Sequence, residues 1–112
     1  MSNKIIDGVP QIDAEGLKEI IESKKEIVLI DVREPHEYDA GHIPGVPLVP
    51  MNTIPSKMSE LEKDKEYVFI CRSGNRSHQV AHYLKANGFS NVHNFYGGMM
   101  SWKEPVKTGM EE

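Results

Sequence analysis

The sequence predicts an α/β domain built on a mainly parallel sheet of about five strands, with helices on both faces. Two observations carry this prediction. Short apolar runs of strand length, such as 27–30 and 67–70, recur along the chain and are separated by segments with helical periodicity. The run 27–30 is apolar at every position, which is typical of a strand covered on both faces. Strands that alternate with helices in this way form parallel sheets in α/β domains.

Length and composition suit one domain over residues 1–112, with a core at about 9–103 and a polar tail at 105–112. The 17 acidic and 13 basic side chains give a net charge of −4 and form no basic stripe, which argues against a nucleic-acid partner. The N-terminus lacks an apolar signal stretch, and no apolar run approaches the roughly 18–20 residues that cross a membrane. The single cysteine cannot form an internal disulfide. We therefore expect a cytoplasmic protein without a membrane partner.

The first half of the chain predicts an extended entry at 11–12 and then a helix from Asp13 to about residue 23. Asp13 can cap this helix. The strand 27–30 follows and ends at Asp31, and a short helix then begins at Pro35, a residue that suits the first helical turn. Segment 46–49 can form a further strand, for which Pro47 favours an edge or irregular position.

The second half predicts a helix within 51–63, the strand 67–70, and a helix that ends before Gly88. A short strand at 91–95 and a short helix at 97–102 complete the domain. The Gly97-Gly98 pair allows a close approach of this last turn to the loop after residue 70. We expect the tail 105–112 to be frayed.

The stretch between the strand 67–70 and the next helix carries the chemistry; its sequence is Cys71-Arg72-Ser73-Gly74-Asn75-Arg76-Ser77. Backbone N–H groups of such a turn, together with the N-terminus of a helix, favour negative charge. The helix end and the two arginines are expected to stabilise a thiolate on Cys71. Since ligands of parallel sheets bind beyond the carboxyl ends of the strands, Asp31 and Cys71 are expected to lie near each other.

Four motifs resemble those of the single-domain rhodaneses, a family of thiosulfate-type sulfurtransferases, and they come in the order and at the spacing of that family. They are Asp31-Val32-Arg33-Glu34 with Glu37-Tyr38, Gly41-His42-Ile43-Pro44-Gly45, the loop from Cys71 to Ser77, and Tyr96-Gly97-Gly98-Met99 with Trp102. One departure is Val46-Pro47-Leu48, where the family more often has a small residue and an asparagine. The resemblance implies a rhodanese-like three-layer fold.

The resemblance also implies a reaction. Cys71 would take the outer sulfur of thiosulfate or another sulfane donor, become a persulfide, and pass that sulfur to a thiophilic acceptor. The loop from Arg72 to Arg76 (Arg72, Ser73, Gly74, Asn75 and Arg76) would cradle the persulfide, without a metal or organic cofactor. Because the chain has one cysteine, the acceptor is external: cyanide, a small thiol, a thioredoxin-like protein or a sulfur-carrier protein.

Supporting roles are expected for Asp31, Arg33 and Ser77. Asp31 can orient the site by pairing with Arg33 or Arg76, and Arg76 either holds the loop through a carboxylate or contacts the substrate. Ser77 and Asn75 are candidates to cap the helix. His42 is expected to brace the fold through hydrogen bonds. His78 and His82 share a helix face but lack a third ligand, so we interpret them as ordinary helix residues.

Three alternative interpretations use the same residues. Cys71 could be an inert core thiol, although the polar residues after it are poor core neighbours. A cysteine phosphatase or an arsenate reductase also places a thiolate in an anion-binding turn, but the phosphatase loop has one residue more between cysteine and arginine than the four found here. The chain could also be a binding module, or a sulfur-relay protein with little turnover on small molecules.

Overall fold

A five-stranded sheet forms the middle layer of the computed structural model, which describes residues 4–23 and 26–111. The order of the strands is β1-β2-β5-β4-β3, and every pair except the antiparallel β1–β2 pair is parallel. This confirms the predicted α/β class with a mainly parallel sheet. The strands are β1 (Ile5–Ile6), β2 (Val9–Ile12), β3 (Ile27–Asp31), β4 (Glu66–Ile70) and β5 (Val92–Phe95).

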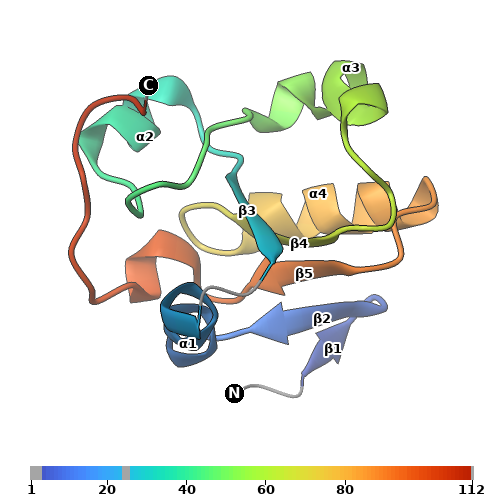
Figure 1. The fold of residues 1–112 in the computed structure, drawn as a ribbon, viewed down its shortest axis with the longest axis horizontal. Helices are drawn as coiled ribbons and strands as arrows, with labels where there is room; N and C mark the ends of the chain where they lie inside the picture. Colours follow the sequence, from blue (N-terminus) through green and yellow to red (C-terminus); the bar gives the residue numbers. More distant parts are fainter. Residues whose placement is uncertain (1–3, 24–25, 112) are drawn as a thin grey trace.

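Helices cover both faces of the sheet, as Figure 1 shows. On one face lies α1 (Ala14–Ser23), whose Leu17 and Ile20 share a buried cluster with alternate residues of the sheet. On the other face lies α4 (Asn75–Ala86), together with the short helices around α3. The remaining helical segments are α2 (Pro35–Ala40), η1 (Met51–Thr53), α3 (Ile54–Lys57), η2 (Met58–Glu60) and η3 (Gly98–Ser101).

Strand β4 shows why the apolar runs of the sequence have apolar residues on both faces of the strand. Tyr67, Phe69 and then Cys71 belong to the cluster under α4, whereas Val68 and Ile70 belong to the cluster under α1. Successive side chains of a strand point to opposite faces, so a strand between two helical layers has no face that requires polar side chains. The same alternation directs Cys71 toward the α4 face.

The membership of the sheet differs from the expectation at two places. Segment 46–49 forms only one bridge, between Leu48 and Asp31, because Pro47 has no N–H to donate to a ladder. The fifth strand is instead β1, which Asp7-Gly8 joins to β2. Both turn residues have positive φ (53° and 77°), as two-residue hairpin turns of the Asp-Gly type require.

The helix expected within 51–63 is broken into the three short segments η1, α3 and η2. Pro55 stands in the first turn of α3, where its missing N–H is tolerated, and it prevents continuation of the preceding turn. Helix α1 begins as predicted: Asp13 Oδ1 accepts a hydrogen bond of 2.8 Å from Gly16 N–H.

The prediction of a frayed tail is wrong for residues 105–111, and Glu112 lies outside the described residues. Lys107 and His42 exchange two backbone hydrogen bonds of 2.8 and 2.9 Å, and Gly109 N–H donates to Asp39 O at 2.8 Å. The tail therefore runs back past α2, as the red segment of Figure 1 shows. Sequence polarity alone did not reveal these backbone pairings.

Among the described helices, none is long and apolar enough to cross a membrane.

Candidate active site

Cys71 directly follows β4 and is fully buried, with 0% of its surface exposed. Two groups that follow Cys71 in the chain, one in the turn and one in the first turn of α4, contact its sulfur. Gly74 N–H donates to Sγ at 3.1 Å, and Ser77 Oγ lies 3.2 Å from Sγ. The sulfur also lies near the N-terminal end of α4, where the helix dipole favours negative charge. Cys71 thus belongs to the buried cluster under α4 and also has polar contacts to its sulfur.

The shape of the loop depends on glycines at two positions. Gly74 has φ of 95°, and a Cβ there would lie 3.0 Å from Gly97 N and 3.1 Å from Phe95 O. A Cβ on Gly98 would lie 2.5 Å from the carbonyl oxygens of Cys71 and Arg72. The turn at 97–98 therefore packs directly on the loop, which confirms the close approach expected from the glycine pair.

Two backbone hydrogen bonds hold this turn on the loop. Met99 N–H donates to Cys71 O at 2.8 Å, and Met100 N–H donates to Arg72 O at 2.9 Å. Segment η3 therefore covers the main chain of the loop. Trp102 follows η3, and its ring packs edge-on against Phe95. The first loop carbonyls are fixed by contacts from outside the loop.

Arg76 is engaged by a carboxylate of α2. Its two terminal nitrogens donate to the two oxygens of Glu37 at 2.7 and 2.8 Å. The hydrogen bond from Arg76 lowers the pKa of Glu37 from 4.5 to about 2, while burial opposes the shift and a bond from the Glu34 backbone adds to it. Of the two roles expected for Arg76, this geometry fits that of a residue that holds the loop. Arg72, in contrast, is exposed.

Asp31 pairs with Arg33 and not with Arg76. Both oxygens of Asp31 accept hydrogen bonds of 2.9–3.1 Å from the Arg33 guanidinium, and Arg33 N–H donates to Oδ1 at 3.0 Å. Arg33 also donates to Gly41 O at 2.8 Å. Both side chains are buried, so this pair fixes the chain that follows β3.

The capping roles expected for Ser77 and Asn75 are wrong. Helix α4 begins at Asn75 after Gly74, without a side-chain capping bond. The Ser77 hydroxyl donates instead to Oδ1 of Asn94 in β5. Ser77, the third residue of α4, is buried against the sheet and is therefore not available to cap the first turn.

Sequence reasoning missed Asn94 and its neighbour Gln11. Asn94 Nδ2 donates to Gly74 O at 2.9 Å and to Gln11 Oε1 at 2.7 Å, and both side chains are buried. A signal was present, because each residue stands two places after a buried valine of its strand, Val92 or Val9, at an inward position. A polar residue at an inward position needs a buried partner.

Two histidines, His42 and His78, make contacts that connect distant parts of the chain. His42 stacks on Tyr38 with 3.7 Å between ring centroids, and its ring nitrogens lie 3.1 Å from Tyr38 O and 2.7 Å from Glu111 Oε2. The bond to His42 is the main cause of a lowered pKa of Glu111. This confirms that His42 braces the fold. His78 contacts Gln11 and Asp7, at 3.2 and 2.9 Å.

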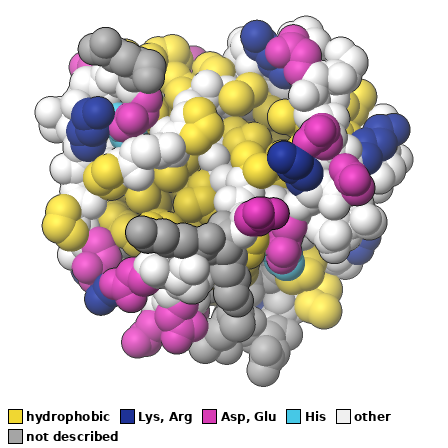
Figure 2. Space-filling model, viewed as in Figure 1, with side chains coloured by type: hydrophobic (Ala, Val, Ile, Leu, Met, Phe, Trp, Pro, Cys, Tyr) yellow, Lys and Arg dark blue, Asp and Glu magenta, His cyan; other side chains and the backbone are white. Residues whose placement is uncertain are grey.

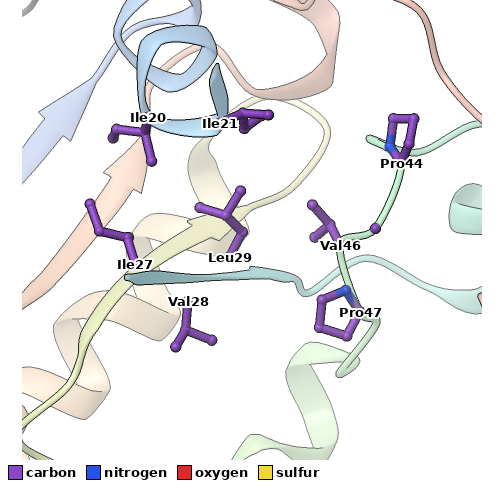
Figure 3. A pocket seen from close by; sticks show the side chains of 9 residues that line it. Ile20, Ile21, Ile27, Val28, Leu29, Pro44, Val46 and Pro47 are labelled. Atoms are coloured by element: carbon purple, nitrogen blue, oxygen red, sulfur yellow. The ribbon is translucent and has the colours of Figure 1, made fainter. Parts of the chain in front are cut away.

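An apolar hollow of about 310 Å³ lies away from this loop, between α1, β3 and the segment 44–47 (Figure 3). Its lining contains no residue of the loop and no charged side chain. On the face seen in Figure 2, hydrophobic side chains gather toward the left and centre. The hollow offers nothing to hold an anion or to activate a nucleophile.

Known proteins share this fold. The model of the rhodanese-like domain matches residues 13–105, so the chain belongs to the rhodanese-like family. The chain is 50% identical over 99 residues to YtwF of Bacillus subtilis (strain 168), covering 88% of this chain and 95% of that protein. It is 40% identical over 94 residues to a protein named "Sulfurtransferase" of Allochromatium vinosum, covering 84% and 88%.

A solved structure has the same fold. The crystal structure of a rhodanese-like domain protein from Staphylococcus aureus superposes with a TM-score of 0.80 at 35% identity, covering 88% of this chain and 96% of that one. The family and the relatives named sulfurtransferases together support sulfurtransferase activity in general.

Proposed function

We propose that the protein moves a sulfane sulfur from thiosulfate or a similar donor, through a persulfide on Cys71, to a thiophilic acceptor. The observation that carries this proposal is the surroundings of the sulfur. A single cysteine, beside the N-terminus of α4, contacts a backbone N–H and a hydroxyl at 3.1 and 3.2 Å. Such groups suit a sulfur atom that becomes negatively charged during a reaction.

The reaction has two steps. In the first, the Cys71 thiolate attacks the outer sulfur of thiosulfate, the S–S bond of the donor breaks, and sulfite leaves with the bonding electron pair. In the second, the acceptor attacks the outer sulfur of the persulfide, and the thiolate is regenerated; with cyanide the product is thiocyanate. A covalent intermediate of this kind gives ping-pong kinetics.

The two arginines of the loop have different roles in this mechanism. Arg76 is tied to Glu37 and holds the start of α4 in place. Arg72 is exposed beside the nucleophile and meets the charge of the donor. The backbone from Arg72 to Arg76 cradles the persulfide, while Asp31 and Arg33 fix the neighbouring chain. Because Cys71 has no exposed surface, a donor reaches the sulfur only after atoms of the loop move aside.

The acceptor comes from outside the chain, because no second cysteine is present to resolve the persulfide. A small thiol, a thioredoxin-like protein or a sulfur-carrier protein fills this role in the cytoplasm, and cyanide fills it in an assay. The reaction needs no metal and no organic cofactor, since the thiolate supplies the nucleophile and the loop supplies the electrostatic stabilisation.

A relay role is the second candidate, and the burial of Cys71 favours it. A partner that opens the loop on docking would exchange sulfur faster than small molecules do. Low turnover on cyanide together with rapid loading of the sulfur would indicate the relay. Phosphatase chemistry ranks lower because only four residues separate Cys71 from Arg76.

The test is thiocyanate production from thiosulfate and cyanide by the Cys71→Ser variant. We expect the rate to fall to the uncatalysed background while the circular dichroism spectrum stays native. Ser101→Ala is the matched control: its hydroxyl bonds Gly98 O at 2.9 Å, next to the loop, but does not contact the sulfur. Thiocyanate production by Cys71→Ser at the native rate would rule out the mechanism.

A further inference from the structure

Both residues whose polar groups contact the sulfur of Cys71 are also bonded to one side chain, that of Asn94. Asn94 Nδ2 donates to Gly74 O, and Asn94 Oδ1 accepts from the Ser77 hydroxyl. Gly74 and Ser77 are also the two residues whose N–H and Oγ reach Sγ. Asn94 comes from β5 and does not itself contact the sulfur, so its influence on Cys71 passes through these two neighbours.

The orientation of the Asn94 amide is fixed by its partners. Nδ2 faces two oxygens, Gln11 Oε1 at 2.7 Å and Gly74 O at 2.9 Å. A flipped amide would set its oxygen against both of them, and oxygens without hydrogens cannot bond to one another. Asn94 Oδ1 therefore remains an acceptor that points at Ser77.

Gln11 is held in place by a series of contacts that extends to the protein surface. Its Nε2 donates to Val9 O at 2.9 Å and lies 3.2 Å from His78 Nδ1. His78 Nε2 lies 2.9 Å from Asp7 Oδ2 in the turn between β1 and β2. The chain of contacts thus runs from an exposed aspartate to the buried Asn94, and each amide in it has one satisfied orientation.

The Ser77 hydroxyl has a single proton and two neighbours that can accept it. When Cys71 is a thiol, its S–H can donate to Ser77 Oγ while Ser77 donates to Asn94 Oδ1, so all three groups are satisfied. When Cys71 is a thiolate, the sulfur can only accept, and its charge attracts the Ser77 proton in addition to the bond from Gly74 N–H. Asn94 Oδ1 is then left unpaired in a site where Asn94 is 2% exposed.

We propose that Asn94 is a positioning residue that competes with the sulfur of Cys71 for the hydroxyl proton of Ser77 and thereby favours the thiol form of the resting site. The inference deepens the proposed function, because it concerns the charge state of the proposed nucleophile. Arg76, which pairs with Glu37 on α2, interacts electrostatically with Cys71. The other charged groups nearby in the chain are the sequence neighbour Arg72 and the Asp31–Arg33 pair at the end of the adjacent strand β3. All of them stay in place in the variants below.

The test follows the ultraviolet absorbance of the thiolate against pH, with Cys71→Ser subtracted to remove the tyrosine contribution. Because the chain has one cysteine, the difference reports Cys71 alone. Asn94→Leu should lower the midpoint by about one pH unit, a tenfold gain in thiolate below the midpoint, as expected for losing a competitor of this strength. Ser77→Ala should raise the midpoint, and Ser101→Ala should leave it unchanged.

The double variant gives the decisive comparison. If Asn94 acts through the Ser77 proton, Asn94→Leu has no effect on the midpoint once Ser77 is alanine. A midpoint that rises in Asn94→Leu, or that moves equally in both backgrounds, would show that Asn94 acts through Gly74 or through packing and would overturn the proposal. If Asn94→Leu does not fold, Asn94→Val is measured with the same expectations, since valine suits a strand.

Failure of this proposal is distinguishable from failure of the proposed function. The titration needs no sulfur donor and no acceptor, whereas persulfide formation is read as a gain in protein mass. A native mass gain with the wrong titration pattern refutes the competition for the proton. The expected titration pattern without any mass gain refutes the sulfur transfer.

Discussion

Two polar clusters lie at the carboxyl edge of the sheet, and they differ in whether their polar groups are fully paired with one another. In the Asp31 brace, defined as Asp31, Arg33 and the Gly41 carbonyl, the Asp31 carboxylate and the Arg33 guanidinium bond to each other, and both side chains are buried. In the sulfur loop, residues 71–77, one hydroxyl serves two neighbours and Arg72 is exposed. The closed cluster stabilises the fold, whereas in the proposed mechanism the open cluster provides groups for sulfur transfer.

The clusters also differ in what holds them. The brace joins residues that are two apart in the sequence, and Gly41 is only eight residues beyond Arg33. The loop is held by α2, β5 and η3, which are far from it in sequence: Glu37, Asn94 and Met99 each contribute a contact. Changes in the brace should therefore affect stability first, and changes around the loop should affect reactivity first.

The largest stability effect is expected at the brace. Asp31→Ala leaves the buried Arg33 guanidinium without its carboxylate and should lower the free energy of unfolding by about 3–5 kcal/mol. Chemical denaturation followed by Trp102 fluorescence measures it. The double variant Asp31→Leu, Arg33→Met removes both charges and should lose less than Asp31→Ala alone. A double variant that loses more would show that the pair stabilises the fold by itself.

A smaller effect, with a defined pH dependence, is expected at the Glu37–Arg76 pair. The pKa of Glu37 is about 2 in the folded protein, below its ordinary value of 4.5. The stabilisation is therefore present above about pH 4.5 and is lost as the pH falls toward 2. Glu37→Gln should lower the free energy of unfolding by on the order of 2 kcal/mol at neutral pH, because the pair is partly exposed.

The difference in free energy of unfolding between Glu37→Gln and the native protein should shrink as the pH falls toward the pKa of Glu37 in the folded protein, about 2. Asp39→Asn, an exposed carboxylate of the same helix α2, serves as the control and should show little change at any pH. A stability difference for Glu37→Gln that persists in acid would mean that the side chain acts through packing rather than through its charge.

The smallest effect is expected at Arg72 and concerns binding alone. Arg72→Ala should raise the KM for thiosulfate about five- to tenfold, since an exposed charge near an anion contributes about 1 kcal/mol in water. The effect should weaken at high salt. Lys57→Ala removes an exposed cation outside the loop and should leave the KM unchanged. An unchanged KM for Arg72→Ala would exclude Arg72 from donor binding.

Local patterns were sufficient to predict most of the fold. The apolar run 27–30, the strand 67–70 and the glycine pair at 97–98 each determine their structure within a few residues of sequence. Asp7-Gly8 carries an equally local hairpin signal, which places β1 beside β2. Segment 46–49 failed as a strand because Pro47 removes a donor, a local feature whose weight depends on the neighbouring strand.

The parts that could not be predicted depend on residues far apart in the chain. A carboxylate partner for Arg76 was one of the two roles expected from the sequence, but the sequence contained no sign that Glu37, 39 residues away, supplies it. The tail lies over His42 through backbone bonds, which composition does not encode. Gln11 and Asn94 meet only because β2 and β5 are neighbours in the sheet, so their partnership follows from topology.

The central claim is that Cys71 carries the transferred sulfur. Intact-mass spectrometry of the purified protein, before and after thiosulfate and again after cyanide, tests it most directly. The proposed mechanism predicts a gain of about 32 mass units on Cys71 with thiosulfate and its loss with cyanide, as a covalent sulfur intermediate requires. An unchanged mass after treatment with several sulfane donors, in a protein whose Cys71 remains open to alkylation, would contradict it.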